Sequence, residues 1–158
     1  MSATSLPAFL DAFVTQLQER DGLAGVAVYS CPVAPEDLGA EGIEMAAEVA
    51  VSQARAAMGS DDLEEEYEVS GSVLVYSALS GGGRVEAVNA AAKRARDRCE
   101  ELLAEIADQL ADDDTADASV RDVGFSAQTW HQGMAPESQM GRVCWCEFRL
   151  AVRAHVTP

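Results

Sequence analysis

Histidine and cysteine are the residue types of this sequence that could do acid–base, nucleophilic or metal chemistry, and they are few. The two histidines, His131 and His155, fall in an expected loop and on the polar face of an expected strand, and neither has a convincing catalytic neighbour in sequence. A zinc site that combined His155 with Cys144 and Cys146 would need side chains from opposite faces of one strand. We therefore expect no metal site and no cofactor.

The cysteines are more typical of packing than of catalysis or cross-linking. None of them forms a C-x-x-C pair, and no basic residue lies near Cys31 in sequence to activate its thiol. We expect all of them to be small core or turn residues in a reducing compartment. The four are Cys31, Cys99, Cys144 and Cys146.

Carboxylates and glycines form three further patterns that resemble ligand sites. The runs 64–66 and 112–114 offer acidic oxygens, but neither lies in a calcium loop of about twelve residues with a glycine at the sixth place. Residues 81–83 are three glycines before a helical stretch, without the lysine or glycine spacing of a nucleotide-binding motif. Solvated turns and a linker are the better interpretation, and we expect the protein not to be an enzyme.

Composition indicates one ordinary globular domain over residues 1–158. Of the 158 residues, 48% are hydrophobic and 24% are charged. The formal net charge of -16 disfavours sequence-specific binding of nucleic acid and binding to anionic lipid. The sequence has no signal-peptide pattern and no apolar stretch long enough to span a membrane, so we expect a soluble protein made in the cytoplasm.

Two helices are predicted by their apolar stripes. Leu6, Phe9, Phe13 and Leu17 belong to a stripe with helical spacing, which predicts a helix over 6–20. A near-heptad stripe follows the three glycines and predicts a longer helix over 84–110.

Four strands are predicted by short apolar runs or by alternation. They cover 25–30, about eleven residues around Gly71, 123–130 and 144–156, with a loop at 131–141. Gly71 marks a candidate bulge in the second strand. The last strand places Cys144 to Val156 alternately on an apolar and a polar face. The sequence therefore predicts an α+β fold, with an antiparallel or mixed sheet of about four strands and two helices packed on one face.

An acidic excursion at about 33–66 interrupts this pattern. Residues 36–68 contain eleven acids and only one base, Arg55. The alanine-rich stretch 43–58 favours a helix by composition but has no clean apolar stripe, so its type stays open.

The whole chain resembles the tail terminator family of long-tailed bacteriophages, in the versions found in phages of actinobacteria. The resemblance rests on the opening helix 6–13, the run 25–29, the acidic entry 61–69 into a strand, and the ending from Gly141-Arg142-Val143 into 148–156. It implies a structural virion protein: six copies form a ring at the head-proximal end of the tail tube, stop its growth and join tail to head. The stretch 43–58 fits the family less well.

The resemblance also implies the partners. These are other copies of the chain in a homohexameric ring, the tail tube protein and a head-completion or neck protein, at the tail–neck junction of a virion assembled in the host cytoplasm. DNA passes through the lumen without specific binding, since acidic walls repel phosphates. Alternatives are another head–tail neck or completion protein, and an acidic host-directed binding protein that mimics DNA or neutralises a basic enzyme.

Charge and exposed apolar types nominate a subunit or partner interface. Arginines of the long helix are expected to pair with acids of a neighbouring copy, and large apolar residues near the last hairpin are expected to lie in a contact. The candidates are Asp61, Asp62, Glu64, Glu65, Glu66, Arg94, Arg96, Arg98, Trp130, Met134 and Met140.

Overall fold

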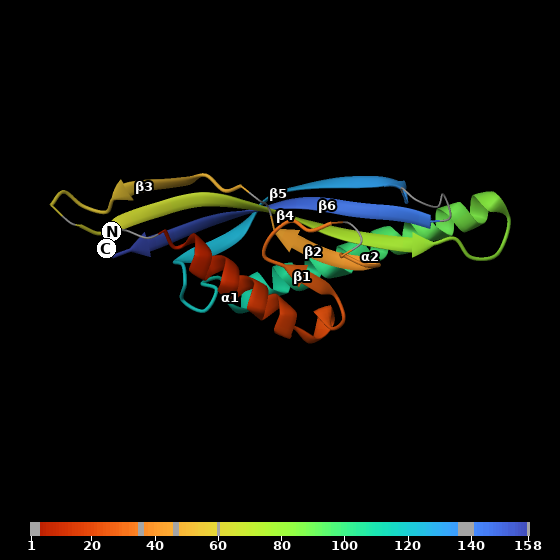
Figure 1. Ribbon diagram of the computed structural model, residues 1–158, viewed down its shortest axis with the longest axis horizontal. Helices are drawn as coiled ribbons and strands as arrows, with labels where there is room; N and C mark the ends of the chain where they lie inside the picture. The colour runs from red at the N-terminus through yellow and green to blue at the C-terminus, as the bar shows by residue number, and fades with distance from the viewer. Residues whose placement is uncertain (1–3, 35–36, 46–47, 60, 136–140, 158) are drawn as a thin grey trace.

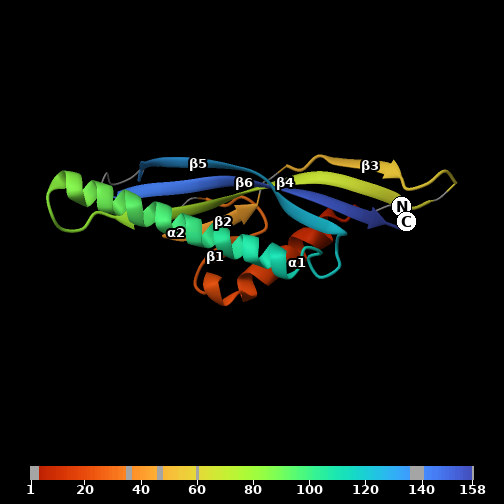
Figure 2. The same ribbon diagram turned by 180° about the vertical axis from the view of Figure 1, so that it is seen from behind.

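The computed structural model describes residues 4–34, 37–45, 48–59, 61–135 and 141–157. In these residues two α-helices lie on the same side of a six-stranded mixed sheet, as the opposite views of Figures 1 and 2 show. The predicted α+β class is confirmed. The expected number of about four strands is too low, because residues 33–66 contribute two further short strands.

Helix α1 (Leu6–Glu19) begins with a proline in its first turn, where the missing N–H would have no helical partner. Its predicted stripe is buried, with Phe9, Phe13 and Leu17 fully enclosed. The helix ends at Glu19 because Arg20 adopts an extended backbone conformation. A short 3-10 turn, η1 (Asp21–Leu23), then leads into the sheet.

Helix α2 (Arg84–Asp112) packs against the two central strands of the sheet. The near-heptad stripe faces the core, where Cys99, Leu102 and Ile106 are fully buried. The helix runs two residues beyond the predicted end, to Asp112. Neither helix of the described residues has the length and apolar character needed to cross a bilayer.

Two strands of sixteen residues form the centre of the sheet. β4 (Leu63–Ala78) and β6 (Gly141–Val156) pair antiparallel over their full lengths, from Leu63 opposite Val156 to Ala78 opposite Gly141. Alternate residues of both strands face the helices and form the core. On β6 these are the predicted positions, and the buried ones are Cys144, Cys146, Phe148, Leu150, Val152 and Ala154.

The remaining strands are arranged unequally around this pair. β2 (Glu41–Met45) and β3 (Val51–Arg55) share one edge of β4, with β3 opposite residues 63–67 and β2 opposite residues 71–75. β1 (Ala27–Tyr29) pairs parallel to β2. β5 (Asp122–Met134) pairs antiparallel with the other edge of β6, so the main path of the sheet is β1-β2-β4-β6-β5.

Gly71 does not form the bulge that the sequence suggested. Pairing continues without interruption through Gly71 opposite Phe148, and the only irregularity of that kind in the described pairing lies between Phe125 and Ala127 of β5. A Cβ atom at position 71 would lie 2.4 Å from Cζ of Phe148 and 3.0 Å from the carbonyl oxygen of Glu44. Glycine is therefore required here for the close packing of a phenyl ring on the strand.

Two connections differ from expectation or from common geometry. The predicted loop 131–141 is shorter than expected, because β5 continues to Met134. After α2 the chain makes a turn in which Ala116, Asp117 and Ala118 all have positive φ angles, of 44°, 56° and 59°. Three consecutive non-glycine residues in this region are costly, and the turn has to be stabilised by its surroundings.

Candidate functional site

The histidines and cysteines singled out in the sequence are held in structural contacts. The ring of His131 stacks on Trp145 with centroids 4.8 Å apart, and its Nε2 lies 3.8 Å from Glu147. His155 Nε2 lies 3.6 Å from Asp62. Among the residues that the structure describes, no three His, Cys, Asp or Glu side chains gather as metal ligands would.

Three of the cysteines lie in the core between α2 and β6. Cys99, Cys144 and Cys146 are fully buried. Burial raises the pKa of all three thiols, which favours the protonated and unreactive form. Cys31 is exposed.

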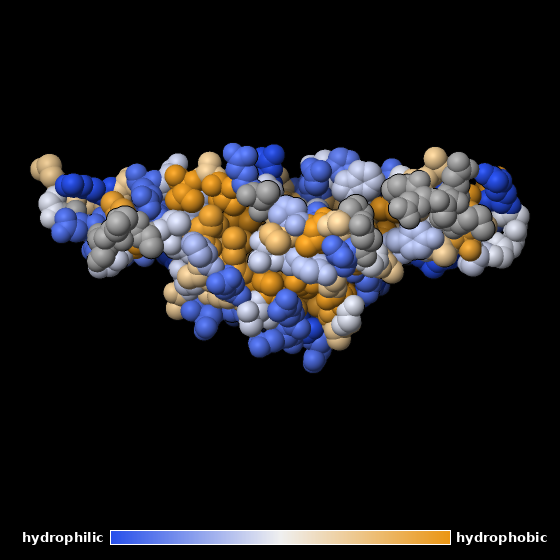
Figure 3. Space-filling model, viewed as in Figure 1, coloured by the Kyte–Doolittle hydropathy of each residue, from blue (hydrophilic) through white to orange (hydrophobic). Residues whose placement is uncertain are grey.

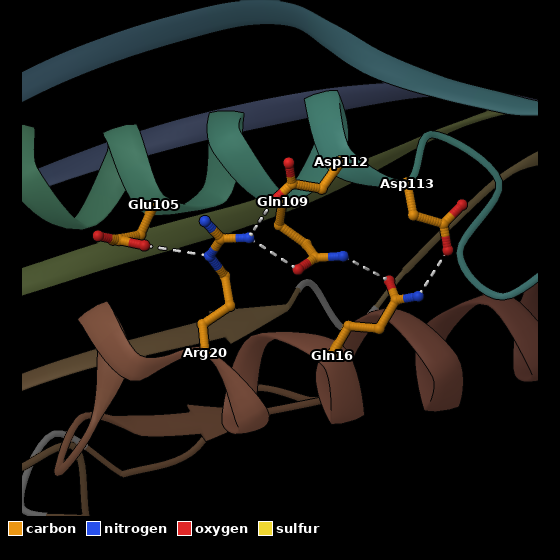
Figure 4. Close-up of polar contacts among 6 residues, drawn as sticks. All are labelled: Gln16, Arg20, Glu105, Gln109, Asp112 and Asp113. Carbon is orange, nitrogen blue, oxygen red and sulfur yellow. Dashed lines mark hydrogen bonds and ion pairs between the residues drawn. The ribbon is translucent and has the colours of Figure 1, made fainter.

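A ladder of polar side chains fastens α1 to α2 (Figure 4). Arg20 binds Glu105 through Nε at 3.0 Å and Asp112 through Nη1 at 2.9 Å, and the hydrogen bond to Asp112 is the main reason that the guanidinium pKa is raised. Arg20 also donates to Gln109, Gln109 to Gln16, and Gln16 to Asp113. The ladder fixes the two helices against each other. Its members are Gln16, Arg20, Glu105, Gln109, Asp112 and Asp113.

All three arginines nominated on α2 form hydrogen bonds within the chain, and Arg94 and Arg98 form theirs to β4, to β2 and within α2. Arg98 holds both carboxylate oxygens of Glu41 on β2, at 2.7 and 3.1 Å, and also binds Glu101 at 3.0 Å. The bonds to Glu41 are the largest cause of its raised pKa. Arg94 donates to the carbonyl oxygen of Ala78 at 2.9 Å, at the end of β4.

Arg96 is placed differently from the other two. Its Nη1 donates to the Gln132 side chain at 2.8 Å, so the guanidinium lies beside the far end of β5. The side chains on β5 that share the face of Gln132 include Trp130 and Met134, which are 43% and 62% exposed. The structure therefore brings Arg96, Trp130 and Met134 together at one edge. Met140, the other nominated residue of this hairpin, lies outside the described residues.

The nominated acids lie far from this group, just before β4 and at its start, where β4 is paired with both β3 and β6. Asp61, Glu64 and Glu66 are exposed. Glu65 is fully buried, and its carboxylate accepts hydrogen bonds from the Ser5 backbone at 2.8 Å, the Ser5 hydroxyl at 2.6 Å and the Gln53 side chain. Glu65 therefore joins α1 and β3 to β4 and is not available to another molecule.

β5 ends the sheet on one side, and its outer edge has no strand partner in the described part of the chain. Residues 126–130 expose both of their faces. One backbone N–H group of β5 has a partner outside the sheet: that of Val123 donates to the carbonyl oxygen of Asp114 at 2.8 Å. From Val123 to Met134 there is no charged side chain and no proline. We call this stretch, which includes Trp130 and Met134, the β5 edge.

On the other side the sheet ends in β1, beyond β2, and in β3, beside the start of β4. β3 exposes residues 52–55. Figure 3, which faces this side, shows an apolar area between α1 and the outer strand. We call β3 and these neighbouring apolar residues the β3 edge. The half-buried hydrophobic residues of the segments involved are Leu6, Leu10, Val49 and Val51.

The two sides of the sheet differ in charge, although β3 itself carries only one charged residue, Arg55. Residues 51–68, which hold β3 and the start of β4, contain six acids and one base. The strands β5 and β6 contain three arginines, Arg142, Arg149 and Arg153, against two acids, and Arg96 lies beside them. In a chain of net charge -16, this separation gives the sheet an acidic side and a side that is locally neutral to basic.

The sheet face that points away from the helices carries shallow hollows rather than a deep cleft. The smaller one, of about 240 Å³, lies over small residues of the central strands, Ser70, Gly71 and Ser72, and is bordered by Glu44 and Arg149. Small side chains on a central strand produce such a depression without any specialised site.

The sequence reasoning missed both sheet edges as such. It found Trp130 and Met134 because they are large and apolar, and Arg96 because it is basic. The strand order that places β5 and β3 at the ends cannot be read from periodicity. The run 123–134 was the available sequence signal for the β5 edge, because it lacks the charged residues that usually protect an edge strand from pairing.

Comparison with known proteins adds no family assignment. No protein-family model matches the chain, and no match was found among curated proteins. The function therefore has to be inferred from the two edges and from the sequence resemblance.

Proposed function

We propose that this protein is a tail terminator: a structural virion protein whose copies form a ring at the head-proximal end of a phage tail tube, stop tube growth and join tail to head. A sequence resemblance supports the assignment of such a ring to the tail terminator family. It covers the opening helix, the acidic entry to β4 and the closing strand. The partners are then the tail tube protein, a head-completion protein and other copies of this chain.

The two unlike edges of the sheet are the observation that carries the proposal. A contact between one edge and the other edge of the next copy is heterologous, and repeated contacts of this kind give a closed ring when the rotation between copies closes. The acids of residues 61–66, next to β3, lie on the side that would face the neutral-to-basic β5 side of the next copy, which makes such a contact electrostatically favourable. A molecule built for a two-fold dimer would need only one self-complementary surface.

The net charge fits a ring that surrounds DNA. Six copies carry a formal charge of roughly -96, which repels phosphates and lets DNA slide through the lumen without binding. The same charge opposes assembly. Apolar contact and specific ion pairs at the edges must offset the repulsion between copies.

Native mass spectrometry of the purified protein, alone and with the tail tube protein of the same phage, tests the ring. We expect a species of about 100 kDa, six times the 16.7 kDa chain. We also expect that adding the protein to polymerising tube protein shortens the tubes seen by electron microscopy. A protein that stays monomeric with and without tube protein would contradict the proposal and favour an acidic binding protein.

Replacing Arg96 with glutamate tests the edge contact. Arg96 lies beside β5, so reversing its charge turns attraction to a neighbour's acids into repulsion. We expect the protein concentration for half assembly to rise about tenfold. Arg84→Glu is the matched control, because it makes the same change of charge at the exposed start of the same helix. Equal assembly of the two variants would count against a role for Arg96.

A further inference from the structure

The outer edge of β5 has the features of a strand that is meant to be paired. We propose that β5 of one copy pairs antiparallel with β3 of the next copy, so that one sheet continues from subunit to subunit. The inference rests on the proposed ring for the number of copies, and it adds which backbone segments meet. It assigns a hydrogen-bonded contact to two strands that end the sheet within one chain.

Edge strands that remain single usually carry devices that prevent pairing. Such devices are lysines or other charges on the edge, prolines, or a very short strand. β5 is thirteen residues long and has neither charge nor proline from Val123 to Met134. Its bulge, between Phe125 and Ala127, lies near one end and leaves the straight stretch 127–134 open. In a chain that is 24% charged, an exposed edge of this kind indicates that a partner covers it.

Strand direction makes the arrangement antiparallel, and length selects β3 as the partner. β1, which ends the same side of the sheet and runs in the direction of β3, has only three residues, and the Gln18 side chain already donates to its Val28 carbonyl oxygen. β4 and β5 are both antiparallel to β6, so they run in the same direction, and β3 runs against β4. A neighbouring copy that continues the sheet keeps these directions, apart from the rotation between copies. Its β3 therefore meets β5 antiparallel, and its helices stay on the same side of the continued sheet.

The surroundings of the two strands match. On the helix side, β5 presents Trp130 and Met134, and β3 presents the half-buried Val51, with the half-buried Val49 just before it in the chain. Aromatic residues and methionine are enriched in buried interface cores.

The positions of the strands along the sheet also set the geometry of the assembly. β3 lies opposite residues 63–67 of β4, whereas the open stretch of β5 is aligned through β6 with residues 70–77. Each copy must therefore be shifted along the strands relative to its neighbour. A stagger of this kind, with tilted strands, is what closing a sheet on itself requires.

Cross-linking between two variants that each have one exposed cysteine, with the buried Cys99, Cys144 and Cys146 retained, tests the pairing. In a Cys31→Ser background, Ala54→Cys marks β3, and Ala127→Cys or Thr129→Cys marks β5; all three positions are exposed and lie on the face away from the helices. One variant is labelled with ¹⁵N, the two are mixed at about 0.15 M salt, and a short bismaleimide is added. We expect cross-linked dimers that contain one labelled and one unlabelled chain.

The control replaces the β5 cysteine with Glu100→Cys, at an exposed position of α2. Mixed dimers with this control should be at least tenfold fewer. Two results would overturn the inference. One is predominant cross-linking between two copies of the Thr129→Cys variant, which indicates a symmetric β5–β5 contact. The other is no excess of mixed dimers over the Glu100→Cys control.

A second variant tests the same contact without cysteines. Thr129→Lys places a charge on the exposed edge, where it blocks strand addition but leaves the core of the subunit untouched. We expect unchanged thermal unfolding of the monomer and loss of assembly. Normal assembly of Thr129→Lys would contradict the pairing.

The outcomes separate this inference from the ring itself. A hexamer by mass without the β3–β5 cross-link would leave the ring standing and overturn the strand pairing. The mixed cross-link with open chains of variable length, and no effect on tube growth, would support the pairing and overturn the tail terminator proposal.

Discussion

Glu65 is the residue whose environment differs most from what its type suggests. Burial raises the pKa of its carboxyl group, and the hydrogen bonds from Ser5, Gln53 and Thr4 more than offset that effect, so the pKa falls below 4.5. The carboxylate thus stays charged inside the fold. It holds the start of α1 and the strand β3 in place on β4.

Glu65→Gln should therefore destabilise the protein. An amide cannot accept all the hydrogen bonds of the carboxylate, and we expect the free energy of unfolding at pH 7 to fall by about 2–3 kcal/mol. Because the folded-state pKa is lowered, this contribution is present above about pH 4.5 and is lost as the pH falls through the folded value. The difference from wild type should shrink accordingly in urea titrations at low pH.

Glu64→Gln, at the exposed neighbouring position, is the control and should change the free energy of unfolding by less than about 0.5 kcal/mol. A loss in Glu64→Gln similar to that in Glu65→Gln would show that the buried hydrogen bonds are not the cause.

The burial of Glu65 could have been predicted from alternation alone. Position 65 has the same parity as Tyr67 and Val69, which face the core. The predicted strand of about eleven residues around Gly71 leaves Glu65 in the acidic excursion at about 33–66. The prediction thus relied on the acidic charge of this segment rather than on the alternation of its residues, and the strand begins at Leu63.

Among the elements, those with a long amphipathic pattern were predictable and the short ones were not. α1, α2 and β6 each bury one face over four or more positions, so their periods are visible in the sequence. β2 and β3 have five residues each, and β3 buries none of its side chains. Their strand structure comes from pairing with β4, a tertiary effect that no local pattern carries.

The turn after α2 is strained, and relieving the strain should stabilise the protein. The Asp113 side chain accepts hydrogen bonds from the Thr115 hydroxyl and from the backbone N–H groups of Thr115 and Asp117, which keeps its pKa well below the usual value and holds the turn. Ala118 is exposed and has a φ of 59°. We expect Ala118→Gly to raise the free energy of unfolding by about 0.5–1 kcal/mol, after the entropy lost by glycine on folding.

Chemical denaturation measures this change, and an exposed helical alanine supplies the control. Ala104→Gly, in the middle of α2, should lower stability by about 1 kcal/mol because glycine is a poor helix former. Two substitutions of the same chemistry are therefore expected to have opposite signs. Destabilisation by both would show that the left-handed turn is not strained at Ala118.

For the whole molecule, charge should make assembly depend on salt in a specific direction. At about 0.01 M salt the repulsion between copies of charge -16 extends over about 30 Å, whereas at about 0.15 M it extends over about 8 Å. Contacts at the edges act at shorter range and are screened less. We expect the assembled fraction to rise between these salt concentrations in sedimentation velocity experiments. A steady fall would mean that attraction between the charged edges outweighs the net repulsion.

The candidate site depends on the whole molecule in a way that the individual residues do not reveal. Arg96, Trp130 and Met134 could be nominated from type and charge, but Arg94 and Arg98 have the same type and are engaged inside the chain. Which arginine lies beside β5 depends on how α2 crosses the sheet. The exposure of β5 and β3 depends on strand order, which is set by pairing between distant segments.

The central pairing of β4 with β6 also constrains when the subunit can exist. Residues that face each other in these strands are 63–93 positions apart in the chain, so the sheet has high contact order and is expected to form slowly. During synthesis β4 emerges well before β6, and the backbone of a sixteen-residue strand then has one edge with no partner. A growing chain cannot present the paired sheet on which both edges depend. In the ring that we propose, subunits would therefore complete folding before they assemble, and β4 has to be kept from pairing with other nascent chains in the interval.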